Sequence, residues 1–122
     1  MSRYLTAVVV IALLFAGCAN NEPPPEPMTL TYFYEIICCS CEETPEQKQI
    51  SSDIFTLSRG ADHIEAKAYD IYTALGHEAL ITMAERLGRD AMVFTPPALV
   101  VNDELFVGET AIITELDRLH GR

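Results

Sequence analysis

The sequence contains few basic residues. Lysine and arginine together number 8 among 122 residues, against 18 aspartates and glutamates, and the formal net charge at pH 7 is −10. This shortage argues against nucleic-acid binding, which depends on basic side chains that neutralise phosphates. It also argues against a polybasic surface for anionic membranes. The chain shows no internal repeat, no phosphate-binding loop and no nucleophilic serine with a base nearby.

A long apolar segment is also missing. The longest apolar run, residues 4–16, is shorter than the ~20 residues that a membrane-spanning helix needs. It follows Arg3 and fits the apolar region of a secretory signal. It leads into Leu-Phe-Ala-Gly-Cys at residues 14–18, which resembles the lipobox of bacterial lipoproteins, although Phe15 stands where leucine is commoner. The resemblance implies cleavage before Cys18 and lipidation of that cysteine. An ordinary signal peptide and a short uncleaved anchor are the alternatives.

Proline dominates the segment after this cysteine. Four of the five residues 23–27 are proline, which excludes a helix or a central strand and favours an extended spacer rising ~3 Å per residue. A disordered tether without a spacing role is the alternative. We therefore expect a signal peptide at residues 1–17, a lipidated cysteine and tether at residues 18–28, and one domain at residues 29–122. The expected location is the cell envelope, on the outer face of the cytoplasmic membrane or the periplasmic side of an outer membrane.

The remaining sequence alternates between strand and helix patterns. Residues 29–37 are aromatic and β-branched, as in a central strand, and Thr44 and Pro45 are typical of a helix start. Residues 63–71 are expected to form a half-buried strand, in which Ile64, Ala66 and Ala68 alternate with Glu65, Lys67 and Tyr69. The other expected elements are a helix at 77–87, a hairpin with strands at 98–102 and 105–107, and a helix at 109–120. The order β-α-β-α-β-β-α predicts an α/β fold with a mixed four-stranded sheet flanked by helices. The crossover helix predicts parallel pairing of the first two strands.

Three of the four cysteines stand together. Cys38, Cys39 and Cys41 directly follow the first predicted strand, whereas a disulfide scaffold would spread its cysteines along the chain. At the start of a helix, unpaired amides and the helix dipole would favour a thiolate at Cys38. Cys41, one turn later, could then attack a mixed disulfide formed at Cys38. This spacing indicates redox chemistry.

Two segments carry a resemblance to a known family. Residues 33–41, an aromatic pair followed by three residues and Cys-x-x-Cys, resemble the active-site segment of the thioredoxin superfamily. Residues 95–101, Thr-Pro-Pro-Ala-Leu-Val-Val, resemble the cis-proline segment of that family, with Pro97 as the matching proline. Gly108 resembles the glycine after the family's last strand. The likeness covers residues 29–122.

The resemblance implies a thiol–disulfide oxidoreductase with a thioredoxin-like fold. Cys38 would attack, Cys41 would resolve the mixed disulfide, and the backbone at Pro96 and Pro97 would pair with the substrate. The implied partners are protein thiols and disulfides, a redox partner that recycles the cysteine pair, and the membrane through the lipid anchor. We expect a monomer that needs no cofactor and no metal.

The sequence departs from the family at several positions. Ile37 stands where the family often has tryptophan, and the chain has no tryptophan. Tyr32 occupies the position of a buried aspartate that assists proton transfer in many thioredoxins. Pro45 comes four residues after Cys41, whereas the helix-kinking proline usually comes five after. Pro96, before the matching proline, is unusual and could alter pairing with the substrate backbone.

Carboxylates stand on both sides of the cysteines. Glu35 precedes them, and Glu42 and Glu43 follow. Negative charges near a thiolate disfavour it. We therefore expect Cys38 to form a thiolate less readily than in strongly oxidising relatives, and the protein to favour reduction or isomerisation.

Other interpretations stay open at this point. Three thiolates could hold Cu(I) or Zn(II), with His63 or His77 as a fourth ligand, although we expect His63, His77 and His120 to be solvated polar residues. A thioredoxin-like binding module with an inert disulfide is a further alternative. A purely structural disulfide is less favoured, because so short a loop constrains little of the unfolded state. Cys39 is expected to be a bystander facing solvent, with a third redox thiol as the alternative.

Overall fold

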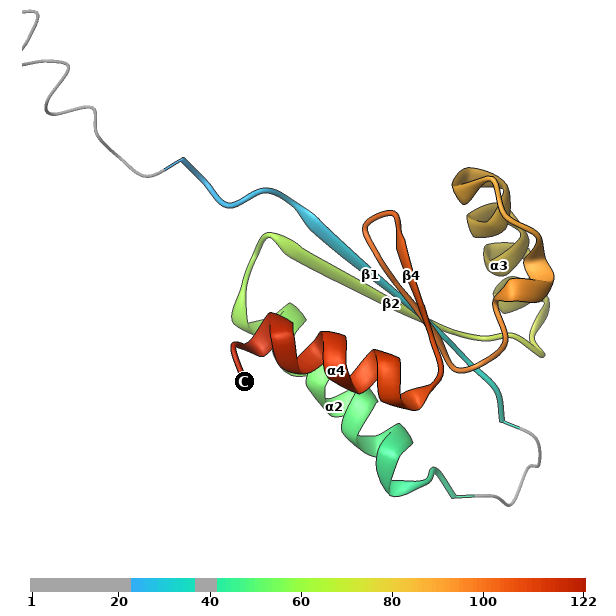
Figure 1. Cartoon of the computed structure of the whole chain (residues 1–122), viewed down its shortest axis with the longest axis horizontal. Coiled ribbons are helices and arrows are strands. Elements are labelled where there is room, and N and C mark those ends of the chain that lie inside the picture. Colours follow the sequence, from blue (N-terminus) through green and yellow to red (C-terminus); the bar gives the residue numbers. More distant parts are fainter. Residues whose placement is uncertain (1–22, 37–41) are drawn as a thin grey trace, which may run out of the picture.

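A mixed four-stranded sheet flanked by three helices forms the protein (Figure 1). The computed structural model describes residues 23–36 and 42–122. The elements are β1 (Met28–Tyr34), α2 (Pro45–Gly60), β2 (Ile64–Asp70), α3 (Ala74–Leu87), the 3-10 helix η1 (Ala91–Val93), β3 (Ala98–Val101), β4 (Glu104–Val107) and α4 (Glu109–His120). The predicted α/β class and the predicted order of strands and helices are confirmed. The predicted signal peptide, Cys18 and the first residues of the tether lie outside the described residues.

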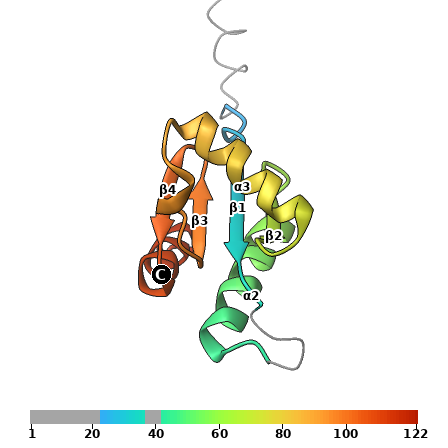
Figure 2. The same cartoon turned by 90° about the vertical axis from the view of Figure 1, so that its right-hand side faces the viewer.

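Strand β1 lies inside the sheet, as its composition predicts. The strand order is β2-β1-β3-β4 (Figure 2). β1 runs parallel to β2, with Met28 opposite Ile64, and antiparallel to β3, with Phe33 opposite Ala98. β3 and β4 form the predicted antiparallel hairpin. The parallel pair requires a crossover, and α2 supplies it.

The alternation of side chains along β1 divides the core into two clusters. Leu30 and Tyr32 lie in the cluster on the face covered by α2 and α4. Phe33 lies in the cluster on the other face, where α3 and η1 pack. Figure 1 shows α2 and α4 side by side on one side of the sheet and α3 on the other. Among the described residues, two long helices therefore cover one face of the sheet and a single long helix covers the other.

Local capping sets the start of two helices. Thr44 forms a capping box at α2: its hydroxyl accepts from the amide of Gln47 at 3.2 Å, and the Gln47 side chain accepts from the amide of Thr44 at 2.9 Å. α3 begins at Ala74, three residues before the predicted start. The hydroxyl of Thr73 accepts from the amide of Gly76 at 3.0 Å, and this cap fixes the earlier start.

The burial of side chains along β2 differs from the predicted pattern at two residues. Ile64 and Ala66 are half-buried as predicted, but Ala68 is exposed. Tyr69, expected on the outer side, is half-buried and stacks on Phe33 with ring centroids 5.8 Å apart. β2 is an edge strand, so a methyl group there gains little cover, whereas the Tyr69 ring is large enough to reach the core.

Within residues 23–36 and 42–122, no helix has the length and apolar character that a membrane span requires.

Candidate functional site

The segment with the three clustered cysteines follows β1 at one edge of the sheet. β1, β2 and β4 end at this edge and β3 begins there (Figure 2). The amide of Ile71 donates to the carbonyl of Tyr34 at 3.0 Å, which joins the ends of β1 and β2. We call this the strand-end edge and define it by residues 34–36, 70–73, 95–97 and 107–109.

The cysteines themselves lie outside the described residues, which include neither Cys38, Cys39 and Cys41 nor Cys18. Their neighbours on both sides are described. Ile36 is about half exposed, and Thr44 has an extended backbone with φ −66° and ψ 160°. α2 therefore begins afresh at Pro45 and does not continue from Cys41. The sequence alone does not decide between a helix that runs on from Cys41 and one that starts after Thr44, and the capping box at Thr44 settles it. Cys38, six residues before Thr44, is therefore not at the N-terminus of α2, where the helix dipole was expected to favour its thiolate.

The proline pair begins the third strand at this edge. The Pro96–Pro97 peptide bond is cis, as the family resemblance implies, and both prolines are half-buried. The carbonyl of Pro97 accepts from the amide of Gly108 at 2.9 Å, which ties the start of β3 to the end of β4. Gly108 has φ 93°, a conformation that glycine adopts at no steric cost. Since Pro96 has no N–H, its carbonyl is the only backbone group that it can offer to a partner chain.

No family model, curated protein or solved structure matches this chain. The function of the site must therefore be inferred from the residues themselves.

A buried phenol lies below the edge. Tyr32 is 3% exposed, and its ring lies 5.7 Å from that of Tyr34. Burial, with added repulsion from the carboxylates of Glu109 and Glu43, raises the pKa of Tyr32 to about 12. The phenol is therefore neutral at physiological pH. It cannot supply the negative charge of the aspartate that the resemblance would place there.

A second tyrosine, Tyr72, connects two segments of the strand-end edge. The hydroxyl of Tyr72 donates to the carboxylate of Glu35 at 3.3 Å, and this carboxylate raises the pKa of Tyr72 by repulsion and by the hydrogen bond. Asp70 holds the loop in place: its carboxylate accepts from the Tyr72 amide at 3.0 Å, and its carbonyl accepts from the Thr73 hydroxyl at 2.7 Å. Tyr72 was not among the predicted site residues, because a lone aromatic residue in a loop gives no signal of such a contact.

Apolar side chains are exposed around the same edge. Tyr72 is 67% exposed, Ile36 and Val107 are about half exposed, and Met92 in η1, shortly before the proline pair, is 83% exposed. Exposed apolar groups that gather in one region mark surfaces for interaction with other molecules.

The three histidines are spread over the molecule. His77 is exposed, as expected, but the expectation of a solvated His120 is wrong: its Nε2 lies 3.1 Å from the carbonyl oxygen of Asp53. His63 and His120 line one hollow with Met28, at the start of β1 and so at the opposite end from Ile36. Within residues 23–36 and 42–122, no three metal-ligating side chains gather in a suitable arrangement.

Proposed function

We propose that this protein is a thioredoxin-like thiol–disulfide oxidoreductase of the cell envelope. One observation supports it above all others. Pro96 and Pro97, directly before β3, lie at the same edge of the sheet as the end of β1, from which the Cys-x-x-Cys segment follows. Proximity at the ends of neighbouring strands is what a substrate-pairing proline and a redox pair would require.

The arrangement of the sheet supports the proposal further. A thioredoxin-like fold requires a central strand that leads into the cysteine pair, a parallel neighbour reached through a helix, and an antiparallel hairpin. β1, β2 and the β3–β4 hairpin meet these requirements, with helices on both faces. Lipidation of Cys18 and an extended tether at residues 18–28 would keep this domain at a membrane surface.

The proposed reaction is reversible disulfide exchange. The Cys38 thiolate attacks one sulfur of a client disulfide, that S–S bond breaks, and the released client thiolate takes up a proton. The Cys41 thiolate then attacks Cys38, and the second client sulfur leaves and is protonated. The client gains two electrons and two protons, and the protein is left with a Cys38–Cys41 disulfide. A dithiol redox partner returns the pair to its reduced form.

Charge at the site bears on the direction of the reaction. Glu35, Glu42 and Glu43 are close to the cysteines in the sequence, and no lysine or arginine occurs between Glu35 and Gln47. This acidic surrounding opposes thiolate formation at Cys38. A dithiol that is little stabilised as a thiolate is a better reductant or isomerase than oxidant.

The test is the reduction potential of the pair. The full chain in a non-ionic detergent is equilibrated in a glutathione series, and thiols are trapped and located by mass spectrometry. We expect one reversible two-electron transition that Cys38→Ser and Cys41→Ser each abolish and the matched variant Cys39→Ser retains. A potential near about −270 mV would indicate a reductant and one near about −120 mV an oxidant. Absence of a reversible transition in the unmodified chain would refute the proposal, and stoichiometric copper or zinc after purification would favour a metal-binding function.

A further inference from the structure

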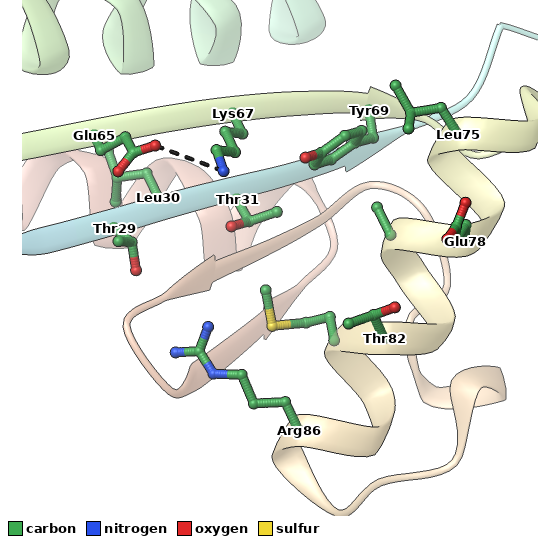
Figure 3. Close-up of a pocket in the computed structure, with 12 residues that line it drawn as sticks. Thr29, Leu30, Thr31, Glu65, Lys67, Tyr69, Leu75, Glu78, Thr82 and Arg86 are labelled. Carbon is green, nitrogen blue, oxygen red and sulfur yellow. Dashed lines mark ion pairs between the residues drawn. The ribbon is translucent and has the colours of Figure 1, made fainter.

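A groove runs along the face of the sheet that has only one long helix. It lies between α3 and the strands β1 and β2 and has a volume of about 380 Å³ (Figure 3). Thr29 and Thr31 line it from β1, and Tyr69 lines it from β2. The volume falls within the range of about 300–1,000 Å³ that is typical of ligand sites.

One end of the groove adjoins the strand-end edge. Leu75, in the first turn of α3, lines this end together with Tyr69, next to the loop in which Tyr72 contacts Glu35. Glu35 is three residues before Cys38. The other end is at Arg86, whose guanidinium lies 2.7 Å from the Asp103 carboxylate in the β3–β4 turn.

The length of the groove suits a short extended peptide. Arg86 stands eleven residues after Leu75, a rise of about 16 Å along a helix. An extended chain advances about 3.3 Å per residue, so about five residues fit along this distance.

The lining combines apolar side chains with hydroxyl groups. Leu75, Ala79 and Met83 line the groove from α3. Thr31, only 9% exposed, places a hydroxyl on the central strand at the groove, and Thr82 adds another from the helix. A hydroxyl both donates and accepts hydrogen bonds, so it can satisfy either backbone group of a peptide. An apolar lining with such groups suits a peptide that has apolar side chains.

The basic groups of the lining are already paired. The Lys67 ammonium lies 3.6 Å from the Glu65 carboxylate, and Arg86 is bound to Asp103. Glu78 adds a further negative charge, in a protein whose net charge is −10. An acidic segment would be repelled from this groove, whereas a neutral or basic one would not.

We propose that the groove binds an extended, mainly apolar segment of about five residues that flanks the reacting cysteine of a client polypeptide. The identity of the client rests on the proposed oxidoreductase function. Extended apolar segments are accessible in chains that have not folded, so the groove directs the enzyme to unfolded or partly folded clients and away from compact ones.

The test compares two neighbouring positions of α3. Thr82 is exposed and lines the groove, so Thr82→Trp fills it with a neutral ring. Ile81 is exposed and does not line the groove, which makes Ile81→Trp the matched control. The substrates are cysteinyl peptides in mixed disulfide with glutathione. Each peptide has a segment of five residues, either apolar or Gly/Ser, on one side of its cysteine. One set of peptides has this segment before the cysteine, and a second set has it after the cysteine. Glutathione disulfide serves as a substrate too small to reach the groove.

In one of the two sets, we expect the kcat/KM of the full chain to be about tenfold higher for the apolar peptide than for the Gly/Ser peptide. Thr82→Trp should remove this preference, leave glutathione disulfide unaffected and retain the circular dichroism spectrum, while Ile81→Trp behaves as the unmodified chain. Equal rates for the apolar and Gly/Ser peptides would overturn the inference, as would equal effects of both variants.

A direct binding measurement separates this inference from the redox proposal. The double variant Cys38→Ser, Cys41→Ser lacks the proposed redox pair, but its groove is unchanged. Fluorescence anisotropy of a labelled, cysteine-free apolar peptide should show binding to this variant and at least tenfold weaker binding once Thr82→Trp is added. If the double variant binds the peptide but the unmodified chain does not exchange disulfides, the oxidoreductase function is refuted and the peptide-binding role of the groove stands. If the unmodified chain exchanges disulfides but the double variant does not bind the peptide, only the peptide-binding role of the groove is refuted.

Discussion

The guanidinium of Arg122 lies 3.0 Å from the carboxylate of Asp53, so a residue beyond the end of α4 is bound to the middle of α2. The Asp53 side chain is 13% exposed, and the carbonyl of the same residue contacts His120. Arg122→Ala would leave this carboxylate largely buried without its main cation. We expect a loss of roughly 1–2 kcal/mol in the free energy of unfolding, below the value for a fully buried pair because Arg122 is itself half exposed. Urea denaturation measures it.

Lys48→Ala is the matched control for this ion pair. Lys48 is an exposed cation on α2, and none of the ion pairs among the described residues includes it. Its removal should change stability by less than about 0.5 kcal/mol. Equal losses in the two variants would show that net charge, and not the contact with Asp53, is responsible.

Gly76 allows α3 to pack against the end of β2. A Cβ atom at this position would lie 1.8 Å from the carbonyl oxygen of Asp70. Gly76→Ala should therefore displace the loop that includes Tyr72 and cost about 2–3 kcal/mol, measured by thermal or urea unfolding. The amide resonances of residues 70–73 should shift in the same variant.

Gly60→Ala is the corresponding control at another helical glycine. A Cβ at Gly60, the last residue of α2, meets no atom within 4 Å, and its φ is not in the left-handed region. Alanine there should leave stability unchanged or raise it by up to about 1 kcal/mol. Destabilisation by both substitutions would mean that helix ends in general, and not the contact with Asp70, resist alanine.

Tyr32 makes stability depend on pH in the alkaline range. Its pKa is about 12 in the folded protein and about 10 in an unfolded chain. Between these values the unfolded state loses the proton first, so the free energy of unfolding contributed by this group is fully present below pH ~10 and falls as the pH rises towards 12. Tyr32→Phe should make this decline shallower, as measured by urea unfolding at pH ~9 and ~11. An unchanged slope would contradict the prediction.

Local patterns in the sequence were sufficient to predict most of the fold. Thr44 caps α2 and Pro45 begins it, as predicted, and the apolar composition of β1 matches its central place. The start of α3 was predicted three residues late because Thr73 and Gly76 weaken the apolar periodicity there. The alternation correctly placed Tyr69 on the same face of β2 as Glu65 and Lys67, but it did not show that α3 covers this face, so the partial burial of Tyr69 was not predicted.

The contacts at the site could be predicted only in part. The cis bond at Pro97 followed from a local motif, whereas the contact between Tyr72 and Glu35 joins residues 37 positions apart. The contact between Arg122 and Asp53 joins residues 69 positions apart. Such pairs depend on how the elements pack, which periodicity does not specify. The groove beside α3 likewise arises because one face of the sheet has a single long helix, and element order alone does not assign helices to faces.

The charge of Glu35 should disfavour the Cys38 thiolate. Glu35 is held at the strand-end edge by Tyr72, three residues before Cys38. Removing this negative charge should lower the pKa of Cys38, because repulsion of the thiolate is relieved. We therefore expect Glu35→Gln to be alkylated faster by iodoacetamide at neutral pH, with the midpoint of the rate–pH curve moved to lower pH.

Glu104→Gln is the matched control for this charge. Glu104 pairs with Val101 across β3 and β4, and Val101 pairs with Leu30 across β3 and β1. Glu104 is therefore level with Leu30, at the far end of the sheet from Glu35. At about 16 Å along the strands, its charge is screened by salt at physiological ionic strength and should leave the Cys38 midpoint in place. If both variants moved the midpoint equally, the overall charge of the protein would control the thiol and Glu35 would have no special role. A midpoint below pH ~5 in the unmodified chain would refute the weak-thiolate hypothesis, because the thiol would then ionise as readily as in strong oxidants.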